Sequence, residues 1–456
     1  DFDAGSFRQA HLELPPVSLR LNPEKIQQPG QLNFIAQNGQ PVTPPLSIDP
    51  ILWSAQGYYL SSRPSFTFDP LFHAGGYYVQ EASSMFLEAV VRQCISHRAI
   101  RILDLCAAPG GKSTLLQSFL GVEGLLVSNE VIRSRTGIVV ENLIKWGGLS
   151  VVVTQADPAD FSSLHSFFDV IVVDAPCSGS GLFRKDADAI ESWSPEAVNL
   201  CSQRQQRILA DVFPALRNEG LLIYSTCSFS AAEDEQVVDW LANQYSVEEV
   251  PVACKAEWGI QETQTPRHHL KGYRFWPQHL RGEGLYLSVL RKKQDEVETS
   301  SSRKGNSLAR VGKQEQEVCR SWLNTATDYT FYHDDEFVYA FPAAYESALL
   351  RLMQSKVRIV RAGLRMGKWV KGQLLPDVAL ALSTQRATLP VVVPLKLEQA
   401  LRYLSRKEIL PEECPATTGW LLAQYQGLSL GWLKRMDNRV NNYWPKEWRI
   451  LKNPEP

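Results

Sequence analysis

The sequence predicts an α/β protein built around a Rossmann-like, doubly wound parallel sheet, with smaller segments before and after it. Two observations indicate this fold. From Arg101 onward, short apolar runs alternate with helix-like segments, and a turn of small residues at 107–111 separates the first run from its helix. With 456 residues, 44% of them hydrophobic and 21% charged, the chain is long enough for two or three globular domains.

Five short apolar runs, each bounded by turn residues or by a helix-like segment, are expected to be the strands of this sheet. They are Ile102–Leu105, Gly124–Glu130, Ser150–Thr154, Phe168–Asp174 and Gly220–Thr226. Helices are expected over Gln80–Cys94, Lys112–Leu120, Ser134–Trp146 and Ser194–Leu216. Because ligands of such sheets bind beyond the carboxyl ends of the strands, the residues after each strand are candidates for a functional site.

The loop after the first strand contains only small residues and ends in a lysine. It reads Cys106-Ala107-Ala108-Pro109-Gly110-Gly111-Lys112. Glycines let backbone approach a ligand closely, and the N-terminus of the following helix presents free N–H groups to it. The loop matches neither the dinucleotide fingerprint G-x-G-x-x-G nor the phosphate loop G-x-x-x-x-G-K-[ST]. Since structural turns often look similar, its role depends on residues further along the chain.

Acidic residues end three successive strands. Glu130 lies at the end of the second strand, Asp157 at the end of the third and Asp174 at the end of the fourth. Glu130 comes about twenty residues after the glycine turn, where doubly wound enzymes place a carboxylate for a ribose diol. An isolated acid is more often a loop residue or a helix cap. Three acids beside one glycine turn favour a ligand with a ribose, an adenine and a cationic centre, which is the profile of S-adenosylmethionine.

Two cysteines follow neighbouring strands. Cys177 lies in Asp174-Ala175-Pro176-Cys177-Ser178, and Cys227 lies in Tyr224-Ser225-Thr226-Cys227-Ser228. A single cysteine is most often a small buried hydrophobe. Two cysteines at the same edge of neighbouring strands predict a catalytic pair that faces one crevice.

With these motifs in order, residues 79–291 resemble the NSun family of RNA cytosine-5 methyltransferases. The resemblance extends upstream into Val17–Lys25. It continues through 363–367 and 427–435, which resemble bacterial RsmF-type 16S rRNA methyltransferases that end in a PUA-like RNA-binding domain. It implies a class I fold that uses S-adenosylmethionine, bound by the 106–112 loop together with Glu130, Asp157 and Asp174.

The resemblance also implies roles for the catalytic residues. Cys227 would be the nucleophile that adds to carbon 6 of cytosine, and Cys177 would assist product release. Asp174 would stabilise the base as charge develops on its ring. Lys185, in a variable basic stretch, is a further candidate. DNA cytosine-5 methyltransferases instead use a Pro-Cys cysteine as nucleophile, which would be Cys177 here, but the Thr226-Cys227 motif favours the RNA enzymes.

Composition shifts along the chain predict five regions. They are an N-terminal RNA-binding subdomain at 1–78, the methyltransferase domain at 79–291, a Ser-rich linker at 292–309, a middle α/β domain at 310–379 and a β-rich PUA-like domain at 380–456. The last 101 residues hold 17 Lys and Arg against 8 Asp and Glu, although the whole chain carries −2. A basic domain on an acidic body indicates a polyanionic partner, and we expect RNA, specifically 16S rRNA or the small ribosomal subunit.

Other classes of protein are disfavoured. The longest apolar runs are shorter than the roughly 18 residues that a membrane span needs. The eight cysteines contain no C-x-x-C pair, which argues against a zinc or disulfide framework and favours a metal-free protein in the cytoplasm. We expect a monomer. Two alternatives stay open, a tRNA cytosine-5 methyltransferase and a non-catalytic RNA-binding ribosome assembly factor, although the intact Asp174, Cys177 and Cys227 argue against the second.

Overall fold

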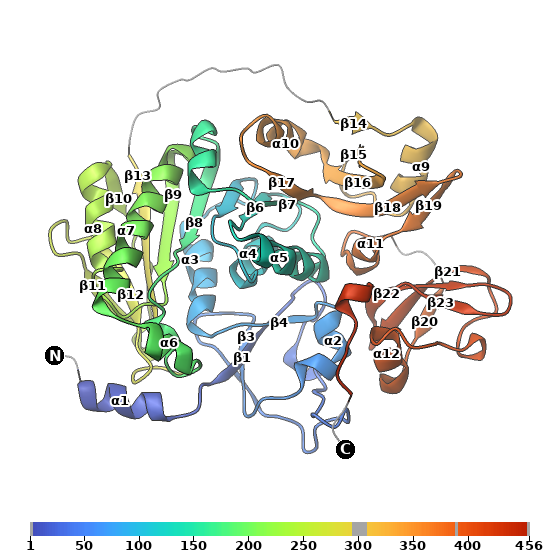
Figure 1. The fold of residues 1–456 in the computed structure, drawn as a ribbon, viewed down its shortest axis with the longest axis horizontal. Coiled ribbons are helices and arrows are strands. Elements are labelled where there is room, and N and C mark those ends of the chain that lie inside the picture. The colour runs from blue at the N-terminus through green and yellow to red at the C-terminus, as the bar shows by residue number, and fades with distance from the viewer. Residues whose placement is uncertain (1–2, 294–307, 388–390, 454–456) are drawn as a thin grey trace.

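A computed structural model describes residues 3–293, 308–387 and 391–453 of the chain. Within these residues the strands form four sheets, and the largest has ten strands (Figure 1). Most of the predicted linker, residues 294–307, lies outside the described residues.

The five predicted strands form the parallel part of the largest sheet, in the order β7-β6-β5-β8-β9. Their bounds are β5 Arg101–Asp104, β6 Leu125–Asn129, β7 Val151–Thr154, β8 Phe168–Asp174 and β9 Leu216–Thr226. The chain winds away from β5 in both directions, so the carboxyl end of β5 is the switch point where ligands of doubly wound sheets bind.

Antiparallel strands extend this sheet at both edges. Beyond β9 lie β13 Leu285–Lys292, β12 Lys271–Phe275 and β11 Gln261–Gln264, and β10 Val247–Glu249 also pairs with β13. At the opposite edge, β17 Ile359–Ala362 pairs with β7. The segment after residue 308 therefore contributes a strand to the central sheet as well as forming a sheet of its own.

Helices cover both faces of the central sheet. One face packs against α3 Phe86–Cys94, α4 Gly111–Leu120 and α5 Arg133–Trp146. The other packs against α7 Pro195–Val212 and α8 Glu235–Gln244, and the short α6 Ala187–Ser192 precedes α7.

Two predicted helix boundaries were wrong. The helix predicted to reach Leu216 ends at Val212, because a 3₁₀ turn containing Pro214 follows and β9 begins at Leu216. The helix predicted from Gln80 begins as a 3₁₀ turn at Ser83 and becomes α-helical at Phe86. Gln80 instead extends a strand, since its N–H donates to the carbonyl of Ser18 at 3.3 Å.

The N-terminal segment forms a four-stranded sheet in the order β2-β3-β1-β4. Its elements are α1 Ala4–Leu12, β1 Val17–Leu21, β2 Ile48–Pro50, β3 Gly57–Leu60, α2 Pro70–His73 and β4 Tyr77–Val79. The buried Arg20 of β1 fastens this sheet to α4, because its guanidinium donates to Thr114 Oγ1 at 2.7 Å and to Gln80 Oε1 at 2.8 Å.

Two further sheets follow β13. The first has the strand order β14-β15-β16-β18-β19. Its strands are β14 Ala309–Arg310, β15 Tyr329–Asp334, β16 Phe337–Pro342, β18 Leu364–Val370 and β19 Gln373–Pro376. The helices of this region are α9 Lys313–Ser321, α10 Glu346–Met353 and α11 Val378–Leu382. The second consists of β20 Val392–Pro394, β21 Gly419–Tyr425, β22 Leu428–Arg435 and β23 Val440–Asn442 with α12 Leu397–Leu404.

One hydrophobic core joins the N-terminal sheet to both of these later sheets. It contains Tyr77 from β4, Met366 from β18, and Trp432 and Trp444 from the C-terminal region. Both tryptophans are completely buried. They are therefore packing residues and cannot stack on bases. Among the aromatic residues of the C-terminal region, the exposed Tyr443 is available for such stacking.

Candidate active site

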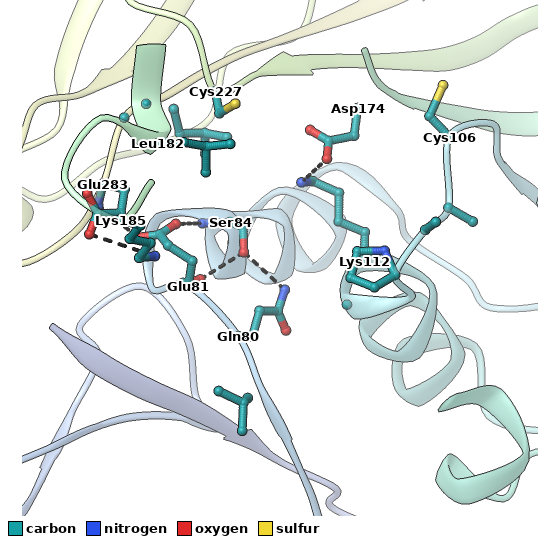
Figure 2. A pocket seen from close by; sticks show the side chains of 18 of the residues that line it. Gln80, Glu81, Ser84, Cys106, Lys112, Asp174, Leu182, Lys185, Cys227 and Glu283 are labelled. Atoms are coloured by element: carbon teal, nitrogen blue, oxygen red, sulfur yellow. Dashed lines mark hydrogen bonds and ion pairs between the residues drawn. The ribbon is translucent and has the colours of Figure 1, made fainter. Parts of the chain in front are cut away.

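A cavity of about 400 Å³ opens at the switch point, beside the carboxyl ends of β5, β8 and β9 (Figure 2). Its walls come from the 106–112 loop, from the ends of β8 and β9, and from antiparallel segments near β4 and β13. The lining residues are Tyr78, Val79, Gln80, Glu81, Ser84, Cys106, Ala107, Ala108, Pro109, Gly111, Lys112, Asp174, Ala175, Gly181, Leu182, Lys185, Cys227, Glu283, Gly284 and Leu285. Its volume is in the range of about 300–1,000 Å³ that holds small-molecule ligands.

The 106–112 loop is held open by its neighbours. Gly110 has a φ of 117° and caps the N-terminus of α4, a left-handed conformation that favours glycine. Asn142 of α5 donates its side-chain N–H to the carbonyl of Pro109 at 2.8 Å. Six of the seven predicted loop residues line the cavity, and Gly110 supports the turn from behind.

Lys112 and Asp174 form an ion pair inside the cavity. Lys112 Nζ lies 2.7 Å from Asp174 Oδ2 (Figure 2). Ser225 Oγ donates to Asp174 Oδ1 at 2.8 Å. Burial lowers the pKa of Lys112, but the Asp174 carboxylate more than offsets it, so the net pKa lies above the usual value and the amine stays charged. The cavity therefore contains a fixed cation and a carboxylate at the end of β8.

The two other predicted acids do not line the cavity. Glu130 is buried, and its carboxylate accepts hydrogen bonds from the N–H groups of Ala108 at 3.3 Å and Ile132 at 2.9 Å. It thus supports the 106–112 loop. Asp157 caps the 3₁₀ turn after β7 by accepting from the N–H of Ala159 at 3.1 Å.

The two cysteines are brought together as predicted. Cys177 Sγ lies 3.2 Å from Cys227 Sγ, and both are free thiols. Cys227 lines the cavity, and Cys177 contacts it from behind. The contact with Cys227, followed by burial, raises the pKa of Cys177 well above the usual value for a thiol. Cys177 is thus kept protonated beside the sulfur that faces the cavity.

Lys185 lines the cavity near its rim. Its Nζ lies 3.7 Å from Glu283 Oε1 (Figure 2). Arg184 pairs with the same carboxylate at 3.1 Å. The sequence reading missed Glu283 and the residues that line the cavity next to β4, among them Gln80 and Ser84. They lie in the segment after β4 and in the loop before β13, so no motif at the end of a parallel strand marks them.

The described residues contain neither a group of three or more His, Cys, Asp or Glu side chains that could hold a metal ion nor a helix long and apolar enough to cross a membrane. A parallel sheet with its small-residue loop, two apposed thiols and a cavity at the switch point defines the class of S-adenosylmethionine-dependent methyltransferases.

Family models place the chain within this class. The description 16S rRNA methyltransferase RsmB/F matches residues 96–291, N-terminal domain of 16S rRNA methyltransferase RsmF matches 1–82, and Methyltransferase RsmF PUA domain matches 390–450. The ribosomal RNA small subunit methyltransferase F of Aeromonas hydrophila is 30% identical over 88% of this chain and 85% of its own length. The protein of that name from Klebsiella pneumoniae is 30% identical over 94% of this chain and 89% of its own. The chain belongs to the RsmF group of the RsmB/F methyltransferase family.

Solved structures agree on the fold. A methyltransferase homologue from Pyrococcus horikoshii has a TM-score of 0.51 and 26% identity, covering 63% of this chain and 90% of that one. NSun6 from Pyrococcus horikoshii with SFG has a TM-score of 0.51 and 18% identity, covering 64% of this chain and 94% of that one. The predicted family, fold class and methyl donor are confirmed: the chain is a methyltransferase that uses S-adenosylmethionine.

Proposed function

We propose that this protein methylates carbon 5 of a cytidine in the RNA of the small ribosomal subunit, 16S rRNA, through a covalent bond between Cys227 and the base. One observation carries the proposal. The sulfur of Cys227 faces the cavity beside the 106–112 loop while the sulfur of Cys177 lies 3.2 Å behind it. In this proposal Cys227 attacks a base that has left its stack, and Cys177 assists the release of the product.

Carbon 5 of cytosine is a weak nucleophile, and Cys227 corrects this. Its thiolate forms a bond to carbon 6, which pushes an electron pair onto the ring and makes carbon 5 nucleophilic. The carboxylate of Asp174, held by Lys112 and Ser225, would accept a hydrogen bond from the amino group of the base and so stabilise the base while this charge develops. After carbon 5 is methylated, its proton passes to a base from solvent, the electron pair of that C–H bond reforms the ring double bond, and the bond to Cys227 breaks to release its thiolate. Cys177 assists this last step.

S-adenosylmethionine supplies an electrophilic methyl group when bound. The cavity fits such a ligand, because small residues of the 106–112 loop form one wall and Lys112 and Asp174 place charges inside it. We propose that residues 106–112 and Asp174 bind it directly. We also include Glu130 and Asp157 in the proposed cofactor site. Glu130 acts by holding the 106–112 loop, and Asp157 lies after β7, at the same edge of the sheet.

The C-terminal region supports RNA as the partner. A second cavity of about 550 Å³ is lined by five cationic side chains, and we call it the basic groove. These are Arg406, Lys407, Lys446, Arg449 and Lys452. All five are exposed. Closely spaced exposed cations bind the phosphate backbone of RNA. We also propose that the protein is a monomer in the cytoplasm, a compartment that its eight free thiols favour.

The experiment is to map 5-methylcytidine in 16S rRNA from cells with and without this protein. We expect one or more 5-methylcytidines to disappear without it and to return when it is supplied again. Loss of 5-methylcytidine from tRNA alone would contradict the proposed substrate, and an unchanged pattern in all RNA would contradict the proposed activity.

A further inference from the structure

Glu233 is a buried acid that the reaction described above does not use. It has no exposed surface and lies in the loop between β9 and α8, six residues after Cys227. A buried carboxylate is costly unless hydrogen bonds compensate it, so its partners indicate what it stabilises.

All the side-chain partners of Glu233 belong to the surroundings of the two cysteines. On the Cys177 side, the N–H of Ser178 donates to Oε1 at 2.8 Å, and Ser178 Oγ donates to Oε2 at 2.5 Å. On the Cys227 side, Ser228 Oγ donates to the same Oε2 at 2.6 Å. The residue directly after each cysteine is therefore bound to one carboxylate.

A fourth hydrogen bond fixes Cys177 from the other direction. Gln205 of α7 donates its side-chain N–H both to Glu233 Oε1 at 3.2 Å and to the carbonyl of Pro176 at 3.0 Å. Both neighbours of Cys177 in the chain are thus tied, directly or through Gln205, to Glu233. Rotation of the Cys177 loop away from Cys227 would break these bonds inside a buried region.

We propose that Glu233 is a positioning residue, whose carboxylate holds the loops of Cys177 and Cys227 together and so sets the distance between the two sulfurs. The consequence for catalysis rests on the proposed function. The proximity of the two sulfurs can be tested separately, by the rate at which an oxidant links them. The charges around the pair agree with it, because the carboxylate adds to the effects that keep Cys177 protonated, whereas the Lys112 ammonium interacts with Cys227.

The experiment compares the full-length protein with Glu233→Gln, which keeps the shape of the side chain but removes its charge and two of its acceptor lone-pair sites. Glu88→Gln is the matched control. Glu88 is also buried and accepts from a serine, Ser54 Oγ at 2.6 Å, but it lies on α3 away from the cysteines. The first readout is the rate at which diamide, which takes up two hydrogens from a thiol pair, links Cys177 to Cys227, followed by mass spectrometry of the linked peptides.

We expect Glu233→Gln to slow this linkage about tenfold and to lower kcat for methylation of unmodified 16S rRNA by about tenfold to a hundredfold, with KM for S-adenosylmethionine within twofold. Glu88→Gln should match the wild type in both. Linkage and kcat within twofold of the wild type in Glu233→Gln would overturn the proposal. If no form of the protein methylates RNA, the proposed function fails, and the linkage rate still decides the role of Glu233.

If Glu233→Gln does not fold, Ser178→Ala and Ser228→Ala test the same bridge one hydrogen bond at a time. Each removes a donor to the carboxylate. Because the two bonds act in series, loss of either one loosens the link between the loops, and we expect the double variant to lose less linkage rate than the product of the single effects. Independent effects of the two serines would contradict a bridge.

Discussion

The backbone N–H of Gly181 donates a hydrogen bond of 2.7 Å to the carbonyl oxygen of Cys227. The two backbone segments approach so closely that a Cβ on Gly181 would lie 2.1 Å from that oxygen. The loop after Cys177 is thus packed directly on the backbone of the proposed nucleophile, and the position admits no side chain.

Gly181→Ala is therefore expected to displace Cys227 and to lower kcat by about a hundredfold, because a shift of about 1 Å in a reacting group costs that much. Gly137→Ala is the matched control, since a Cβ there meets nothing within 4 Å and alanine favours the helix α5. Single-turnover methyl transfer is the measurement. Wild-type rates in Gly181→Ala would contradict the placement of Cys227 in the reaction.

Replacing each of the two cysteines by alanine should impair a different step of the reaction. Cys227→Ala removes the nucleophile, and we expect no methyl transfer and no covalent complex. Cys177→Ala leaves the attack possible but impairs release, so a protein–RNA adduct should accumulate on a denaturing gel. An adduct with Cys227→Ala instead would reverse the assignment and make Cys177 the nucleophile.

The basic groove should control the salt dependence of RNA binding. Each lost phosphate contact lowers the slope of log K against log salt by about 0.7–0.9, so replacing Lys446, Arg449 and Lys452 by alanine should lower it by about two if each contacts a phosphate. Lys255, Arg320 and Lys371, which are exposed elsewhere, supply a control triple variant with the same change in charge. Binding assays at several salt concentrations measure both slopes, and equal slopes for the two variants would argue against the groove.

Point substitutions are preferable to deletion of residues 380–456 for this test. The deletion would remove Trp432 and Trp444 from the core that the C-terminal region shares with β4 and β18. Loss of that packing would unfold more than the RNA-binding surface.

Asp104, at the end of β5, should make stability depend on pH. Burial raises its pKa from 3.8 to about 7, although Ser113 and Lys112 oppose this. Between these values the folded state holds a proton that the unfolded state has released, so stability falls as pH rises from about 4 to about 7, by at most about 1.4 kcal/mol per pH unit.

Asp104→Asn removes this pH-dependent loss of stability, because asparagine does not titrate. We expect its melting temperature, compared with that of the wild type, to rise from pH 5 to about pH 7 and then to level off up to pH 8, as measured by thermal unfolding. The exposed Asp437, changed to asparagine, is the control and should show no such trend. A constant difference between Asp104→Asn and wild type at every pH would contradict a protonated Asp104.

Much of the central fold followed from local patterns. The apolar runs before Cys106, Asp174 and Cys227 became parallel strands, because a short buried strand carries its own signature of apolar residues between turns. Element ends were less predictable. The end of α7 depended on Pro214 and on the pairing of β9, and the latter involves residues far apart in the chain.

By itself the sequence determined the class of the sheet, the 106–112 loop and the two cysteine motifs, since each is set by neighbours in the chain. Only the tertiary structure decided that Cys177 and Cys227, 50 residues apart, lie within 3.2 Å of each other and that Glu233 bridges their loops. It also decided that β17 completes the central sheet and that Trp432 and Trp444 are core residues. These relations depend on distances across the folded chain, and side-chain hydrogen bonds and packing fix such distances without leaving a periodic pattern in the sequence.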